Sequence, residues 1–307
     1  MNKRKQIDLL ARKGMFALSA MICSLFFVIV LGLFLKARPI FSEHTAGEIL
    51  FSSAWHPTRG NFGLASFIAG TVWVTAIAMF IAVPLTILTA IYLSEYAHRN
   101  IREAIRPVID LLAGISPVIY GVWGMIAVVP LVRDHVMPFF SGRFPFFPFK
   151  SDNYTGYSII TAGIVLSVMV FPIIISITCE VLRNVPAAAR EASLALGATR
   201  WQTIKFVILR KAYPGIMAAV ILGLSRALGE TMAVLMISGC SLFGFPKSIF
   251  DTAYPLSALI ANTYGEMMSI PLYESAVFLA AFVLLILTTL FNMVGWGILL
   301  RAQARES

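Results

Sequence analysis

Long uncharged apolar stretches alternate with short charged segments along the whole chain. Five uncharged stretches are long enough for transmembrane helices: residues 14–35, 60–94, 111–132, 153–179 and 275–300. An α-helix crosses ~30 Å of hydrocarbon in about 20 residues. A sixth stretch, about 214–239, has this length only if Arg226 and Glu230 lie within the helix. The pattern predicts an all-α polytopic membrane protein with six transmembrane helices.

Composition supports a membrane protein over a soluble one. Hydrophobic residues make up 59% of the chain and charged residues 13%, with a mean hydropathy of +0.84. Soluble domains carry roughly 25% charged residues. The expected environment is therefore membrane lipid.

Lysine and arginine are distributed unevenly between the two sides that these helices would separate. Of the 24, 16 fall on the side that holds both termini and seven on the other, while Arg226 lies within a helix. Cytoplasmic loops collect these residues, so both termini are expected in the cytoplasm. The same topology explains the net charge of +9, so we do not expect nucleic acid as a partner.

The chain is expected to form one membrane-embedded unit. Residues 1–13 form a basic cytoplasmic N-terminus, and residues 14–35 form the first transmembrane helix. This stretch exceeds the roughly 15 apolar residues of a cleaved secretory signal, which favours a retained signal anchor. Residues 60–301 form a core with five helices that includes the cytoplasmic loop 183–213, and residues 302–307 form a cytoplasmic tail.

The loop 183–213 predicts two short helices joined by a glycine elbow. Asn184 is a candidate N-cap, Pro186 suits a first turn, and the alanine-rich run that follows favours a helix to Leu196. Gly197 provides the left-handed residue that ends this helix. The pattern Thr199-x-x-Gln202 is a capping box that begins the second helix.

The first of these helices carries mainly small residues, with Arg190 and Glu191 expected as exposed charges between alanines. Helices that lie in headgroups usually carry bulky apolar residues opposite Lys and Arg. Docking into a groove of a partner protein is therefore favoured. A surface helix resting on headgroups is the alternative.

Arg226 and Glu230 are ionisable residues at bilayer depth, where a charge costs about 2.5–3.5 kcal/mol on insertion scales and marks a functional site by default. They are four residues apart and are expected to share one helical face. Small residues recur beside them at four-residue spacing, Gly223 with Ala227 and Ser225 with Gly229, which predicts close helix packing. An arginine in a translocation route suits an oxyanion. The alternative is a structural ion pair that joins two helices.

The loop motif Glu191-Ala192-Ser193, followed after three residues by Gly197, resembles the EAA loop of ABC importer permeases. In that family this loop is the coupling helix, which fits into a cleft of the ATP-hydrolysing subunit. Family patterns continue to Leu-Pro, whereas this chain has Leu209-Arg210. The resemblance implies coupling roles for Arg190, Glu191, Ala192, Ser193 and Gly197.

Two further segments, residues 224–234 and 113–124, resemble the PstC-type permease of bacterial phosphate ABC importers. The second is similar to a Pro-Ser-Val-Val-Tyr-Gly run, although here Ser116 precedes Pro117. The resemblance implies a type I importer permease fold in the bacterial inner membrane. It also implies a substrate pathway or gate that includes Arg226, Glu230, Thr231, Ser116 and Tyr120.

The same resemblance implies three partners: a PstA-type permease, a PstB-type ATPase dimer and a PstS-type phosphate-binding protein. The chain has no G-x-x-x-x-G-K-[ST] phosphate loop, so ATP and Mg²⁺ are expected on the partner ATPase. The sequence also shows no paired-carboxylate cleft, metal-ligand cluster or nucleophile with a base, so we expect no enzymatic activity, catalytic residue, metal site or cofactor of its own. Alternatives are a permease for molybdate, sulfate or phosphonate, the PstA-type subunit, and a membrane scaffold or sensor without transport.

Overall fold

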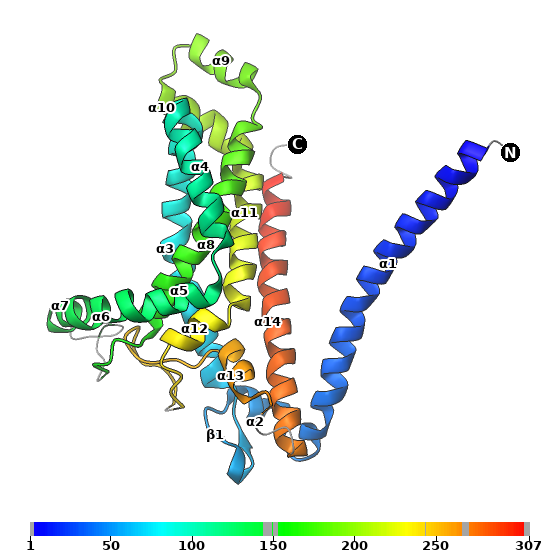
Figure 1. Ribbon diagram of the computed structural model, residues 1–307, viewed down its shortest axis with the longest axis vertical. Coiled ribbons are helices and arrows are strands. Elements are labelled where there is room, and N and C mark those ends of the chain that lie inside the picture. The colour runs from blue at the N-terminus through cyan, green and yellow to red at the C-terminus, as the bar shows by residue number, and fades with distance from the viewer. Residues whose placement is uncertain (1–2, 144–148, 150–152, 243, 266–269, 304–307) are drawn as a thin grey trace.

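The computed structural model describes residues 3–143, 149, 153–242, 244–265 and 270–303, and most of these are helical (Figure 1). The α-helices are α1 (Lys3–Ala37), α2 (Ala46–Phe51), α3 (Ala65–Ile91), α4 (Arg99–Gly114), α5 (Pro117–Trp123), α6 (Val129–Leu131), α7 (Met137–Arg143), α8 (Ile159–Arg183), α9 (Ala187–Ala195), α10 (Arg200–Thr203), α11 (Leu209–Gly229), α12 (Met232–Ile237), α13 (Leu256–Thr263) and α14 (Pro271–Gln303). Single π turns extend or interrupt them at η3 (Tyr92–Tyr96), η4 (Gly124–Val128), η5 (Val132–Val136) and η6 (Ile204–Ile208).

A small structured region precedes α3. It contains the 3₁₀ turns η1 (Arg38–Ser42) and η2 (Pro57–Arg59) and the strands β1 (Trp55–His56) and β2 (Asn61–Phe62). The strands pair antiparallel, with Trp55 opposite Phe62. Figure 1 places this region at the end opposite α9, whereas both ends of the drawn chain lie toward the α9 end.

Within the described residues, six helical stretches are long and apolar enough to cross a membrane: Ala11–Ser42, Ala65–Tyr96, Pro117–Phe140, Ile159–Arg183, Arg200–Gly229 and Pro271–Arg301. The predicted number is confirmed, but two positions are wrong. The third stretch begins at Pro117, because the backbone is extended at Ile115 and Ser116. The fifth begins earlier than predicted and ends at Gly229 instead of near residue 239.

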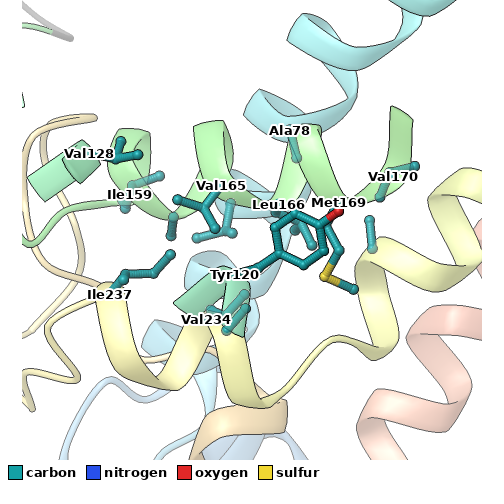
Figure 2. Packing of buried hydrophobic residues seen from close by; sticks show 14 of the residues in the cluster. Ala78, Tyr120, Val128, Ile159, Val165, Leu166, Met169, Val170, Val234 and Ile237 are labelled. Atoms are coloured by element: carbon teal, nitrogen blue, oxygen red, sulfur yellow. The ribbon is translucent and has the colours of Figure 1, made fainter. Parts of the chain in front are cut away.

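The core lies where α3 packs against α8, and it includes buried residues of α5, α11 and α12 (Figure 2). A Cβ at Gly163 would lie 2.5 Å from Ile77 Cγ2, so the glycine is what permits α8 to approach α3. Gly223 similarly brings α11 close to α8, as predicted from its spacing. Gly229, for which the same role was expected, has open space around it.

Two of the six long helical stretches depart from this bundle. In Figure 1, α5, α6 and α7 run across the direction of α3, α8, α11 and α14. The first helix, α1, meets α14 near the β1 end, where Lys36 Nζ lies 2.9 Å from Glu274 Oε1, and then diverges. The apolar part of α1 is therefore exposed in the isolated chain.

Replacing Gly163 by leucine should destabilise the bundle, because Ile77 is β-branched and has little freedom to move away. We expect a loss of about 1–3 kcal/mol in the free energy of unfolding, typical of overpacking. Gly297→Leu is the matched control, since no atom lies within 4 Å of a Cβ there. Thermal unfolding of the purified protein in detergent measures both variants. Equal unfolding midpoints for the two would contradict this view of the α3–α8 contact.

Candidate functional site

The helix that carries Arg226 is broken at Glu230. Helix α11 ends at Gly229, Glu230 has an extended backbone with φ −74° and ψ 128°, and α12 begins at Met232. The prediction that Arg226 and Glu230 share one helical face is therefore wrong. Among the described residues, no ion pair joins their side chains.

Side chains satisfy the polar groups that this break exposes. Ser257 Oγ, from α13, donates to the Glu230 carbonyl at 2.8 Å. The Glu230 carboxylate accepts from the Ala233 N–H at 3.5 Å, and Thr231 Oγ1 donates to the Gly229 carbonyl at 3.3 Å. Backbone groups at membrane depth need such partners, so these contacts stabilise a permanent break rather than a frayed end.

Arg226 lies in the last turn of α11, where a cation interacts favourably with the helix C-terminus. Its side chain is exposed in the isolated chain. The guanidinium makes no hydrogen bond or ion pair with any residue that the structure describes, although Tyr120 is within electrostatic range. A free guanidinium at this depth needs either water or an anionic partner.

Helix α5 begins beside the same region. Ser116 is its exposed N-cap residue, makes no side-chain capping bond, and is followed by Pro117 at the first helical position. Tyr120, one turn later, is 5% exposed, and its hydroxyl donates to the Leu112 carbonyl at 2.8 Å near the end of α4. A Cβ at Gly121 would lie 2.7 Å from Met236 Sδ, so α5 and α12 are in close contact.

The predicted pathway residues thus fall at two neighbouring helix breaks, Ser116 and Tyr120 at α4–α5 and Arg226, Glu230 and Thr231 at α11–α12. Figure 2 shows Tyr120 of α5 packed near Val234 of α12 and Met169 of α8. The polar groups are the unpaired cation of Arg226, the hydroxyls of Ser116, Tyr120 and Thr231, and the Glu230 carboxylate, which accepts from the Ala233 N–H. The unpaired cation suits transient binding of an anion. In the described part of the chain, no three His, Cys, Asp or Glu side chains are grouped to hold a metal ion.

The loop between α8 and α11 has the predicted helix–elbow–helix form. Gly197 has φ +84°, and its N–H donates to the Leu194 carbonyl at 3.0 Å. The Thr199–Gln202 capping box is confirmed, with both reciprocal bonds present at the start of α10. The N-terminal prediction is wrong by two residues, because Asn184 is the C-cap of α8 and Pro186 is the N-cap of α9.

Residues of this loop that the sequence indicated for coupling face in two directions. Glu191, Ala192 and Gly197 are exposed. The Ser193 hydroxyl lies 3.0 Å from that of Thr203 and so joins α9 to α10.

Arg190 is not the exposed charge that the sequence suggested. Its side chain is 28% exposed and pairs with Glu95, its Nη2 atom lying 2.9 Å from Glu95 Oε1. Sequence reasoning missed Glu95, because a single carboxylate at the end of an apolar stretch usually only marks the membrane boundary. Nothing in the sequence indicates a contact between residues 95 positions apart.

A protein-family model described as binding-protein-dependent transport system inner membrane component matches residues 82–296. A probable phosphate transport system permease protein PstC of Methanocaldococcus jannaschii is 35% identical over 88% of this chain and 86% of its own length. The phosphate transport system permease protein PstC 1 of Mycobacterium tuberculosis is 35% identical over 85% and 79%. The probable ABC transporter permease protein YqgH of Bacillus subtilis is 38% identical over 80% and 75%.

Solved structures of ABC importers share the fold. A bacterial alginate ABC transporter, solved with an alginate-bound periplasmic protein, superposes with a TM-score of 0.57 at 16% identity over 95% of this chain and 96% of that one. An inward-facing methionine transporter, MetNI, gives 0.53 at 20% identity over 75% and 94%. This chain belongs to the binding-protein-dependent transport system inner membrane components, the multi-pass permease subunits of type I ABC importers.

Proposed function

We propose that this chain is the PstC-type permease of an importer for inorganic phosphate and forms half of its translocation pathway. The names of the relatives support phosphate as the substrate. The other half is a PstA-type permease, a PstB-type ATPase dimer docks at the α9 end, and a PstS-type phosphate-binding protein docks at the β1 end. ATP and Mg²⁺ bind to the ATPase subunits, so the chain itself is not an enzyme.

The unpaired guanidinium of Arg226 is the observation that carries this proposal. A charge exposed to hydrocarbon is unfavourable, so this surface faces the partner permease across a hydrated passage. Arginine holds its charge at any physiological pH and presents a planar set of donors that matches two phosphate oxygens. Tyr120 is buried within electrostatic range of Arg226, in the neighbouring helix α5, and supports the wall of the same passage.

Glu230 and Thr231 have a different role from Arg226. Their contacts with Ala233, Ser257 and Gly229 hold the α11–α12 break open. The position of Arg226 therefore depends on them without direct pairing. Because no described carboxylate neutralises Arg226, its charge is available to a passing anion.

Helix α9 is the element that meets the ATPase. Leu196 is 89% exposed, Leu194 also projects outward, and Ala192 beside them leaves room for close approach. Exposed apolar residues on a small-residue helix suit a groove in a partner protein. With α9 at the ATPase, α9 and both termini lie on the cytoplasmic side of the membrane, which agrees with the excess of Lys and Arg on that side.

A transport cycle follows from these connections. ATP binding closes the ATPase dimer and draws α9 inward, and the Ser193–Thr203 contact transfers this motion to α10 and α11. The break at Glu230 then moves with the end of α11, which opens the pathway to the opposite side of the membrane. ATP hydrolysis restores the starting state.

Arg226→Gln should reduce phosphate uptake by about tenfold or more, since hydrogen bonds to a charged group contribute ~1.5–3 kcal/mol. Arg226→Lys keeps the charge but loses the planar donor set, so intermediate uptake is expected. Radiolabelled phosphate uptake by membrane vesicles measures this, and co-purification of the ATPase checks assembly.

Arg210→Gln is the matched control, because Arg210 is an exposed arginine at the other end of α11. Normal uptake by Arg226→Gln would exclude a pathway role. Equal competition by molybdate or sulfate would identify a different oxyanion. Assembly with an ATPase but no uptake of any of these anions would support a scaffold or sensor.

Gly197→Val should uncouple transport from ATP hydrolysis. A left-handed backbone at a residue with a side chain costs about 1–2 kcal/mol, which corresponds to roughly a tenfold loss of correctly positioned α9. Asparagine tolerates this conformation, so Gly197→Asn should retain most coupling. The measurement is phosphate imported per ATP hydrolysed in reconstituted vesicles. Since nothing lies within 4 Å of a Cβ at this position, unchanged coupling in the valine variant would refute a mechanical role for the elbow.

A further inference from the structure

The π turn η3, at the α9 end of α3, joins several elements that are distant in sequence. Arg102 of α4 donates to the carbonyls of Leu93 at 2.9 Å, Ser94 at 3.0 Å and Ala97 at 3.3 Å. Arg102 thus satisfies carbonyls that the end of a helix leaves without partners. These three bonds from α4 stabilise the turn independently of the coupling loop.

Arg200, the first residue of α10, contacts the same turn from another side. It donates to the backbone carbonyl of Glu95, and its guanidinium lies 4.8 Å from the centre of the Tyr96 ring. A cation over an aromatic face is attracted by the ring quadrupole. The helix that leads into α11 is therefore attached to the end of α3.

The side chain of Glu95 binds α9, the helix that precedes the Gly197 elbow. Arg190 Nη2 lies 2.9 Å from Glu95 Oε1 and also donates to the Leu182 carbonyl, in the last turn of α8, at 2.7 Å. Ser94 Oγ adds a contact to the same carboxylate at 3.2 Å. One arginine of α9 thus connects the ends of α3 and α8.

This ion pair differs from a surface pair in its burial. The Glu95 side chain is 10% exposed, whereas Glu103, which pairs with Arg99 within α4, is 61% exposed. Exposed pairs contribute little because water and salt screen them. Removing one partner of a buried pair leaves the other charge without compensation, which is strongly unfavourable.

We infer that Glu95 is a positioning residue for energy coupling, which links the coupling helix α9 to α3 through Arg190. The inference rests on the proposed role of α9 as the contact with the ATPase. Displacement of α9 then moves the end of α3 directly. The elbow and the Ser193–Thr203 contact transmit the same displacement separately to α11.

The connection from α9 to α3 through Glu95 matters because of how the helices pack in the core. Helices α3 and α8 are in close contact at Gly163, and α8 also contacts α11 at Gly223. If α9 moved α11 alone, these close contacts would resist the motion. With Glu95 in place, the three helices are displaced together at the α9 end, and the change is concentrated at the breaks beside Arg226.

The test is Glu95→Gln in the complete importer, reconstituted with its partner permease, ATPase and binding protein. Glu103→Gln is the matched control, since it removes an exposed ion pair from the neighbouring helix. We expect phosphate imported per ATP hydrolysed to fall by about tenfold or more in Glu95→Gln and to remain at the wild-type value in the control. Arg190→Gln also removes the bond to the Leu182 carbonyl and should show at least this loss, and the double variant should lose no more than Arg190→Gln alone.

A purely structural pair would affect assembly but not this ratio. Unchanged stoichiometry in an assembled Glu95→Gln importer overturns the inference, and so does additivity of the two single variants. If Glu95→Gln does not assemble, the same ratio is measured for Glu95→Asp, which retains the charge but shortens the reach. A lower ratio of phosphate imported per ATP hydrolysed supports the inference, and an unchanged ratio overturns it.

Hydrogen exchange of the α9 amides, measured in the assembled complex without substrate, separates this inference from the choice of phosphate. Faster exchange by about tenfold in Glu95→Gln, but not in Glu103→Gln, supports the link even if the wild type imports no phosphate. Absence of phosphate uptake by the wild type would refute only the proposed substrate. Unchanged exchange in Glu95→Gln would refute the link itself.

Discussion

The structure depends on hydrogen-bond partners for the carbonyl groups that helix ends leave unsatisfied. Side chains from other elements supply them: Arg102 at the end of α3, Tyr120 near the end of α4, Arg190 at the end of α8, and Ser257 just beyond α11. Each of these bonds joins two elements that the chain alone does not hold together. The helix breaks are therefore stable parts of the fold.

These bonds leave the two functional arginines in opposite electrostatic situations. Arg190 is compensated by Glu95 and serves as a mechanical connection. Arg226 has no described partner, so its charge is available to a ligand. The difference follows from the break at Glu230, because an unbroken helix would place the carboxylate on the same face as Arg226.

The sequence predicted the elbow of the coupling loop, although it misplaced the N-cap of α9. The left-handed Gly197 and the Thr199–Gln202 capping box follow from conformational preferences within a few residues, and both are present. The breaks were harder to predict. Ser116-Pro117 gives a local indication of one, whereas the sequence around Glu230 contains no proline, and its extended backbone is stabilised by Ser257 of α13.

The sequence by itself determined the number of membrane helices from hydropathy and the expected side of the termini from charge. A short motif identified the loop that resembles a coupling helix. Only the tertiary structure decided that Arg226 and Glu230 are separated, that Arg190 faces inward, and that Glu95 is its partner. Such contacts depend on how helices approach one another in space. The approach is set by close packing at Gly163 and Gly223 and by bonds across helix ends, which no local pattern encodes.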